Sequence, residues 1–179
     1  MDDQIETREF FDWVPSCSFT QNLKYDWSAN RDSSKGRLVM ISFRLASRIR
    51  RGKFLRWLGF PYLVVYRVCV EWILGIEIPP LTRIGIGFSV HHGQGIVVNN
   101  RVIIGDACLI RQGVTLGNRS EGDPYGCPVI GNRVVVGANA LVLGRLTVGD
   151  DAVIGAGAVV THDVESGDIV VGNPARSIK

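Results

Sequence analysis

The sequence predicts a mainly β protein, a parallel β-helix preceded by a small α-helical N-terminal region. From about residue 77, aliphatic residues recur every six positions, and glycine follows several of them. The unbroken run is Ile130, Val136, Val142, Val148, Ile154 and Val160. An α-helix does not suit this period, because successive residues would rotate by about 240° and spread over three faces. A triangular coil of short strands suits this period, because each hexapeptide forms one side and its aliphatic residue points inside.

Two further columns support the coil and define its extent. Small or aliphatic residues occupy the fourth place after each position of the run: Val134, Ala140, Leu146, Ala152, Ala158 and Val164. The same spacing begins at Ile84, Val90 and Ile96, then slips by two residues to Ile104, Ile110 and Leu116. From Leu116 to Ile130 the interval is two residues longer than two hexapeptides, so a loop must leave the coil. We expect a helical region over 1–76 and a β-helix over 77–179 with a loop at 117–129.

The helical region is strongly basic. From Ser33 to Val70 there are nine Lys and Arg residues and no Asp or Glu. At helical spacing, one stripe carries Arg37, Arg44, Arg48 and Arg51, and its neighbour carries Leu38, Ile41, Leu45 and Ile49. This amphipathic helix is either a solvated basic face or a contact for an anionic membrane surface or a phosphate-bearing substrate. No nucleic-acid motif accompanies it.

Residues 54–76 are mostly apolar, but their pattern does not predict a membrane-spanning helix. Arg56, Arg67 and Glu71 lie within the stretch and Pro61 interrupts it, which leaves too few uncharged residues for the roughly 20 that a bilayer requires. We expect a helical segment, partly buried or at an interface. The four cysteines form no C-x-x-C pair, and the acidic start "MDDQIETREFFDW" lacks the features of a signal peptide. A reducing cytoplasmic setting is the expectation.

Residues 77–176 contain a series of recognisable motifs: "IGIGFSVHHGQGIVV", "GVTLGN", "RSEGDPYGCPVIG", "VVGANALVLG", "IGAGAVV" and "VVGNPARSI". By these motifs the segment resembles the left-handed hexapeptide-repeat acyltransferases, and within them the serine acetyltransferase family. The resemblance implies a left-handed coil, acetyl-CoA as co-substrate, and homotrimers with active sites between neighbouring subunits. The short helical region makes the layout more similar to enzymes that acetylate bacterial exopolysaccharide, such as those of the colanic-acid type.

The resemblance also assigns roles to residues. His92 matches the general base, which accepts the proton of the attacking hydroxyl, and Glu77 matches the acidic residue that orients it. Their 15-residue spacing is close to one 18-residue coil, so we expect them on adjacent turns about 4.8 Å apart. The positions that match the groove for the pantetheine arm and phosphates of acetyl-CoA are Asn118, Ala138, Ala156 and Arg176.

The acceptor pocket departs from the serine-specific pattern. Where those enzymes have aspartate, arginine and histidine, this chain has His91, Gly126 and Cys127. The residues around Cys127 supply no evident positive charge, so we expect its thiol to line the pocket without forming an acetyl-enzyme. An uncharged saccharide of an exopolysaccharide, or of its lipid-linked precursor, is the expected acceptor. The alternatives are a serine O-acetyltransferase and an inactive solenoid scaffold.

A metal site is not expected. Some hexapeptide-repeat proteins bind zinc through three histidines, but His162 is expected about four coils from His92, far beyond a shared ligand sphere. A site made of His91, Cys127 and Glu77 has no matching motif. Direct acetyl transfer without a metal is therefore the prediction.

Overall fold

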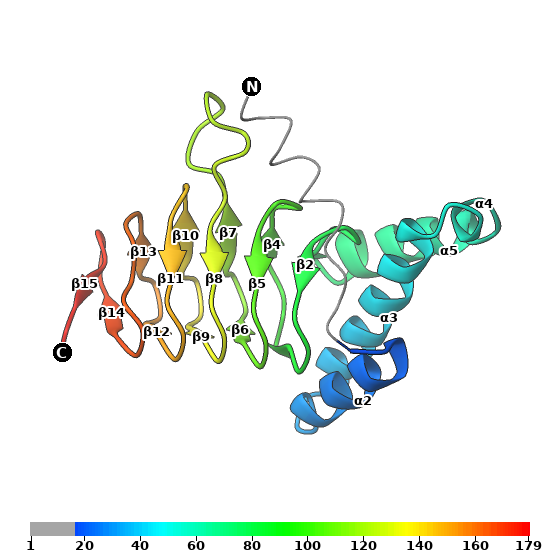
Figure 1. Cartoon of the computed structure of the whole chain (residues 1–179), viewed down its shortest axis with the longest axis horizontal. Helices are drawn as coiled ribbons and strands as arrows, with labels where there is room; N and C mark the ends of the chain where they lie inside the picture. The colour runs from blue at the N-terminus through cyan, green and yellow to red at the C-terminus, as the bar shows by residue number, and fades with distance from the viewer. Residues whose placement is uncertain (1–16) are drawn as a thin grey trace.

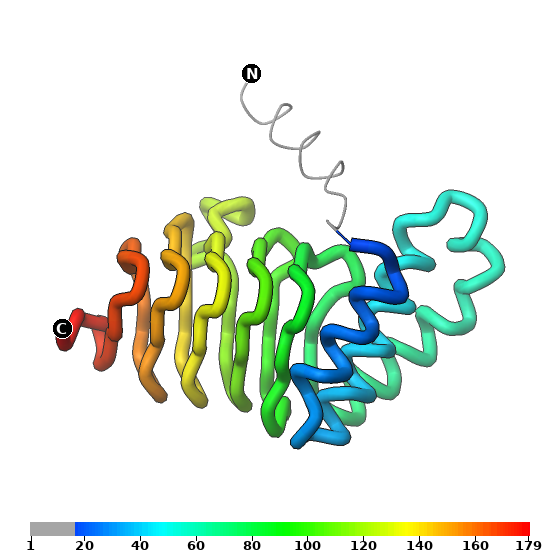
Figure 2. Tube along the Cα trace, turned by 60° about the horizontal axis from the view of Figure 1, so that its bottom comes forward, coloured from blue at the N-terminus to red at the C-terminus, as the bar shows by residue number. Residues whose placement is uncertain are grey.

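The structure confirms a parallel β-solenoid with helices packed against its first coil. The computed structural model describes residues 17–179, so the part of the expected helical region before Cys17 lies outside it. The helices are α2 (Phe19–Ala29), α3 (Ser34–Arg51), α4 (Leu55–Leu58), α5 (Phe60–Tyr66) and the π-helix η1 (Arg67–Ile73). They gather at one end of the solenoid, and the C-terminus lies at the other (Figures 1 and 2).

Three sheets form the sides of the solenoid. Sheet A contains β1 (Ile76–Glu77), β4 (Ile96–Val98), β7 (Thr115–Gly117), β10 (Leu141–Leu143) and β13 (Val159–Val160). Sheet B contains β2 (Arg83–Ile84), β5 (Ile103–Ile104), β8 (Val129–Ile130) and β11 (Thr147–Val148). Sheet C contains β3 (Ser89–His91), β6 (Leu109–Arg111), β9 (Val135–Val136), β12 (Val153–Ile154), β14 (Ile169–Val171) and β15 (Arg176–Ser177). Neighbouring strands pair in parallel, except that β14 and β15 are antiparallel.

The six-residue lattice is the core. All six members of the predicted run are buried, and so is the column four places after them. Each strand pairs with the strand one coil away, so aliphatic side chains of one sheet stack on those of the next coil. A single hexapeptide has no such neighbour, and the burial that stabilises the fold comes from this stacking. The repeat is the one typical of left-handed coils.

The loop is larger than the lattice arithmetic suggested. Thr115 pairs with Leu141, 26 residues later, whereas Leu141 pairs with Val159 after 18. Eight residues therefore leave the coil rather than two. The prediction divided the interval from Leu116 to Ile130 into two hexapeptides, whereas in the structure this interval forms a single corner of the triangle. This corner, residues 118–128, projects between β7 and β8 in Figure 1.

Serine caps start the two longest helices. Ser18 and Gln21 form a capping box before α2, and the Ser33 hydroxyl accepts a hydrogen bond from the Gly36 N–H at 2.9 Å before α3. The face that α3 buries differs from the predicted apolar stripe. Leu38 is exposed, and only Ile49 of that stripe is buried, while the packed residues are Val39, Met40, Phe43, Arg44 and Ala46.

In the basic stripe of α3, Arg48 and Arg51 are exposed, whereas Arg44 is buried because it has internal partners. Its Nε donates to Asp26 Oδ2 at 2.7 Å, and its Nη1 donates to the Ile84 carbonyl at 2.7 Å. Asn30 extends this connection: its Nδ2 donates to the Phe88 carbonyl at 2.8 Å, and its Oδ1 accepts from the Val90 N–H at 2.9 Å. The helices thus cover the end of sheet C that begins with β3, which would otherwise be an unpaired edge.

The expected helical character of residues 54–76 is confirmed through Ile73. Within residues 17–179, none of the helices combines the length and apolar character that crossing a bilayer requires.

Candidate active site

The corner between β3 and β4 carries both adjacent histidines and is larger than the equivalent corner of the next coil. His91 pairs with Arg111, and Val97 pairs with Thr115. Six positions separate His91 from Val97, whereas only four separate Arg111 from Thr115 on the next coil. The corner between β3 and β4 therefore contains two extra residues. His92 lies in the expansion, exposed and with φ at 65°. A left-handed backbone costs a non-glycine residue about 1–2 kcal/mol, and Asn139 adopts the same conformation in a regular corner that also precedes a strand of sheet A.

Gly93 makes this corner possible. Its φ is +75°, and a Cβ atom there would lie 2.8 Å from Ile76 Cδ1 and 3.1 Å from Val90 Cγ1. Any larger residue would therefore collide with the first layer of the core. The corner packs directly on buried side chains, which holds the backbone of His92 in place.

Ala138 and Ala156 lie on the same edge of the solenoid as His92. We call the corners that precede the strands of sheet A, residues 92–95, 112–114, 137–140 and 155–158, the entry edge. Backbone hydrogen bonds connect successive corners: the Asn139 N–H donates to the Gln112 carbonyl at 2.9 Å, and the Gly157 N–H donates to the Ala138 carbonyl at 2.8 Å. Ala138 lies two coils from His92, about 10 Å at the usual strand spacing.

Arg176 continues this line at the last coil. It lies on β15, paired with Val171, and its side chain is exposed. The Ala175 N–H donates to the Val159 carbonyl at 2.8 Å, which fixes the segment beside the start of β13. Three of the four positions predicted for acetyl-CoA thus follow one edge of the molecule that begins at His92.

Asn118 is the exception, because it lies on the other side of sheet A. We call the corners that follow the strands of this sheet, residues 99–102, 118–128, 144–146 and 161–163, the exit edge. The Asn118 side chain accepts a hydrogen bond from Asn99 Nδ2 at 3.3 Å and donates to the Ser120 carbonyl at 2.9 Å. It therefore fixes the start of the loop, and within one chain it is not in line with Ala138 and Ala156.

Glu77 does not stack on His92 as expected. The two-residue expansion lengthens the first coil to 20 residues, so the partner of Glu77 on the next coil is Val97. His92 lies five residues before that partner, and the two side chains form no hydrogen bond or ion pair in the described chain. The exposed Glu77 carboxylate instead lines a groove of about 320 Å³ across sheet A, together with Val97, Thr115 and Asn118.

Cys127 lies between two arginines that the sequence reasoning missed. Arg101, Cys127 and Arg145 each stand two positions before mutually paired strand residues, so they occupy the same place on three successive coils of the exit edge. The expectation that no positive charge lies near Cys127 is therefore wrong. Counting 26 and then 18 residues from Arg101 would have found the column once the loop was assigned to one corner.

The loop is organised around this column. The Arg101 guanidinium lies 3.9 Å from the Tyr125 ring centroid, and Arg145 pairs with Asp123 at 3.6 Å. Burial raises the pKa of the Cys127 thiol, Arg101 and Arg145 oppose that shift, and Asp123 adds to it. The thiol therefore stays protonated at neutral pH, which makes it a poor nucleophile.

His162 lies on the exit edge after β13, three strands from β4 in sheet A rather than the expected four coils. At the usual strand spacing it is still too far from His92, which lies on the entry edge, for both to bind one metal ion. Within residues 17–179, no three His, Cys, Asp or Glu side chains are grouped so as to hold a metal ion.

Comparison with known proteins agrees with the repeat and with the chemistry suggested by the motifs. Residues 127–162 match the family model described as bacterial transferase hexapeptide (six repeats). The colanic acid biosynthesis acetyltransferase WcaB of Escherichia coli (strain K12) is 41% identical over 155 residues, which cover 84% of this chain and 95% of that protein. The serine acetyltransferase of Helicobacter pylori (strain ATCC 700392 / 26695) is 40% identical over 142 residues, which cover 78% of this chain and 79% of that protein.

Solved structures give the same result. Soybean serine acetyltransferase complexed with serine superposes with a TM-score of 0.77 at 31% identity, over 90% of this chain and 70% of that one. A serine acetyltransferase in complex with CoA superposes with a TM-score of 0.70 at 28% identity, over the same shares of the two chains. The chain is an acyltransferase and belongs to the hexapeptide-repeat family that includes the colanic-acid and serine acetyltransferases.

Proposed function

We propose that this protein is an O-acetyltransferase that moves the acetyl group of acetyl-CoA directly onto a hydroxyl of a saccharide, in an exopolysaccharide or its lipid-linked precursor. The observation that carries the proposal is the entry edge, where an expanded corner presents His92 at the start of a line through Ala138, Ala156 and Arg176. The small alanines leave room for the pantetheine arm, and Arg176 supplies a charged donor for phosphate.

His92 is the proposed general base. The hydroxyl oxygen bonds to the thioester carbonyl carbon as the imidazole takes the hydroxyl proton, and the carbon–sulfur bond then breaks to release CoA thiolate, which the imidazolium protonates. Such a base contributes about 10²- to 10⁴-fold in rate. Glu77 remains the proposed orienting carboxylate. The two side chains are not in contact in the described chain, so this role is a proposal that rests on the resemblance.

We place the acceptor between two subunits of a homotrimer. His92 lies on the entry edge and Cys127 on the exit edge, and β4 and its neighbours separate these edges in one chain. Both contribute to one pocket only if the exit edge of one subunit faces the entry edge of the next. Under this proposal His91 and Asn118 also face the shared pocket from opposite subunits.

The saccharide acceptor is supported by the layout. The match to the colanic acid acetyltransferase covers 95% of that protein, and the side chains at positions 91, 126 and 127 supply no carboxylate for an amino-acid ammonium group. Serine O-acetylation is the second candidate, favoured by the superposition on serine-bound soybean serine acetyltransferase. The proposed setting is the cytoplasm and the inner face of the membrane, where lipid-linked sugars are assembled.

The test is acetyl transfer from labelled acetyl-CoA to a panel of L-serine, nucleotide sugars and oligosaccharides. We expect transfer to a saccharide and poor use of L-serine. Formation of O-acetylserine with a kcat/KM above roughly 10⁴ M⁻¹s⁻¹, within the usual enzymatic range, would replace the saccharide by serine. An inactive scaffold is tested separately by acetyl-CoA binding, which it would lack.

A further inference from the structure

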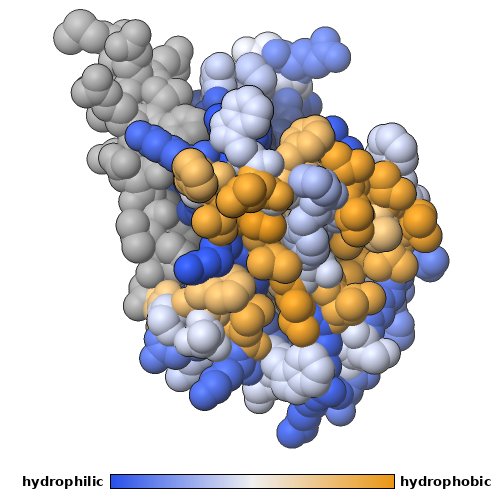
Figure 3. Space-filling model, turned by 90° about the vertical axis from the view of Figure 1, so that its right-hand side faces the viewer, coloured by the Kyte–Doolittle hydropathy of each residue, from blue (hydrophilic) through white to orange (hydrophobic). Residues whose placement is uncertain are grey.

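The helical end of the molecule exposes many large apolar side chains. Phe54, just before α4, and Trp57 and Leu58, on α4, are 80%, 82% and 74% exposed, and Trp72 and Ile73, on η1, are each 73% exposed. Figure 3 shows apolar side chains gathered over this end. Scattered exposed apolar residues are ordinary in a protein surface, but a continuous cluster of aromatic and aliphatic groups marks a contact surface. We call residues 54–73 the helical end face.

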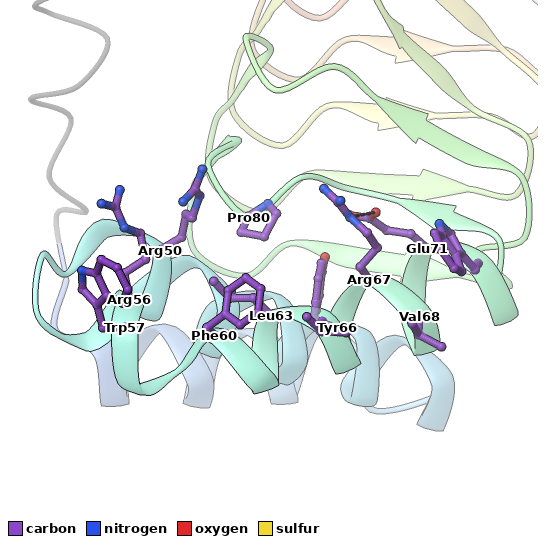
Figure 4. Close-up of a pocket in the computed structure, with 12 residues that line it drawn as sticks. Arg50, Arg56, Trp57, Phe60, Leu63, Tyr66, Arg67, Val68, Glu71 and Pro80 are labelled. Carbon is purple, nitrogen blue, oxygen red and sulfur yellow. Dashed lines mark ion pairs between the residues drawn. The ribbon is translucent and has the colours of Figure 1, made fainter.

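A groove of about 760 Å³ runs along this face. Its apolar lining includes Trp57, Phe60, Leu63, Trp72 and Pro80. The charged groups around it are Arg50 and Arg56 at one end and the Arg67–Glu71 ion pair, at 3.4 Å, at the other (Figure 4). Cations therefore outnumber the single carboxylate along the groove.

The structure separates the basic residues that serve the fold from those beside this face. Arg37 stacks on Trp27, Arg44 is buried against Asp26, and Arg48 lies over Phe19. The whole block from Ser33 to Val70 is thus not one binding surface. Arg50, Lys53 and Arg56 are exposed cations next to the apolar residues, at the end of α3 and in the segment that leads through α4.

We infer that the helical end face docks on an anionic lipid bilayer, with its aromatic side chains among the acyl chains and Arg50, Lys53 and Arg56 against the headgroups. Tryptophan and phenylalanine beside arginine and lysine are typical of surfaces that lie in the membrane interface. A second copy of the chain is a poorer occupant. A two-fold contact places the same patch on both partners, and it would bring these cations together with only Glu71 to offset them.

The position of the face suits this partner. The helices lie beyond the first coil, at the end of the solenoid opposite the C-terminus (Figures 1 and 2). A bilayer contact there leaves the entry edge, the exit edge and the projecting loop uncovered. The inference names a membrane partner for the proposed enzyme, but it does not require acetyl transfer to be observed.

The test is co-sedimentation of the full chain with phosphatidylcholine vesicles that contain or lack phosphatidylglycerol, at low and high salt. We expect binding only to the anionic vesicles, and weaker binding as salt rises. Each basic residue near such a surface is worth roughly fivefold in affinity, so Arg50→Gln, Lys53→Gln and Arg56→Gln together should weaken binding about 100-fold. The matched control changes three exposed basic residues elsewhere, Lys24, Arg31 and Lys179, to Gln and should bind almost as well as the unaltered chain.

The apolar contribution is tested with Trp57→Ser and Leu58→Ser, two exposed positions whose replacement leaves the core intact. This double variant should lose most vesicle binding at low salt, and the fluorescence blue shift on binding should fall in Trp57→Phe, which keeps an aromatic ring. Equal binding to both kinds of vesicle, or none at low salt, overturns the inference. So does concentration-dependent self-association that Trp57→Ser and Leu58→Ser abolish, because a second copy would then cover the face. Acetyl-CoA turnover of these variants in solution tests the enzyme independently.

Discussion

Mixing two inactive variants should restore activity if each active site is shared between subunits. The first variant is His92→Ala, which removes the proposed base from the entry edge. The second deletes residues 119–126, the eight residues by which the 26-residue coil exceeds its 18-residue neighbour. The deletion joins Asn118 to Cys127 and leaves a corner as long as 144–146, so the coil keeps its register.

Each variant alone should lose at least about 100-fold in turnover, since one lacks the base and the other the acceptor loop. In a mixed trimer, a site is intact when its histidine comes from a loop-deleted chain and its loop from a His92→Ala chain. With random mixing in a closed head-to-tail ring, each condition holds for half of the chains, so about one quarter of the sites recover.

The assay is acetyl-CoA turnover after co-expression of the two variants, with subunit composition determined by native mass spectrometry. A mixture of His92→Ala with a chain that carries both changes is the control, because no arrangement of those chains contains the base. If mixed trimers form and activity stays at the level of the separate variants, each site lies within one chain and the edge-to-edge arrangement is wrong.

Three further predictions concern single residues. Cys127→Ser should keep substantial activity, and no acetyl group should be trapped on Cys127 in mass spectrometry, because burial raises the pKa of that thiol. For the same reason, alkylation of Cys127 by iodoacetamide should be slow at neutral pH and accelerate only in alkaline solution. Gly93→Ala should destabilise the fold by about 1–2 kcal/mol or more in urea unfolding, through its left-handed φ and the contact with Ile76, and should lower turnover by moving His92. Asp26→Ala should cost about 3–5 kcal/mol in the same assay, because it leaves Arg44 buried without its carboxylate.

The solenoid was predictable because its repeat is local and its interior is uniform. Every sixth residue from Ile130 to Val160 points inward, and the chain alone shows that spacing. The packing of α3 was not predictable in this way. Helical periodicity treats Arg44 as a surface residue, yet Asp26, 18 positions earlier, and the Ile84 carbonyl, 40 positions later, stabilise it inside the protein. Such contacts depend on how the helices meet the first coil.

In the candidate site, too, the local features could be predicted from the sequence and the contacts between coils could not. Motif matching placed His92 at a corner, and the structure puts it in an expanded corner with a strained backbone. The stacking of Glu77 on His92 failed because their 15-residue spacing is three residues short of a regular 18-residue coil, and the two-residue expansion of the corner raises the offset to five. Arg101 and Arg145 were missed because a lattice argument follows the inward-facing residues, and these two arginines are not members of that lattice.

The charges on the exit edge bear on the choice between the two acceptors. Serine presents a carboxylate and an ammonium group, and a pocket that binds it needs charged partners of both signs. Arg101 and Arg145 offer positive charge beside Cys127, but the carboxylate near them, Asp123, already pairs with Arg145. The ammonium group of serine would therefore have to displace Arg145 from Asp123, which is consistent with the proposed saccharide acceptor.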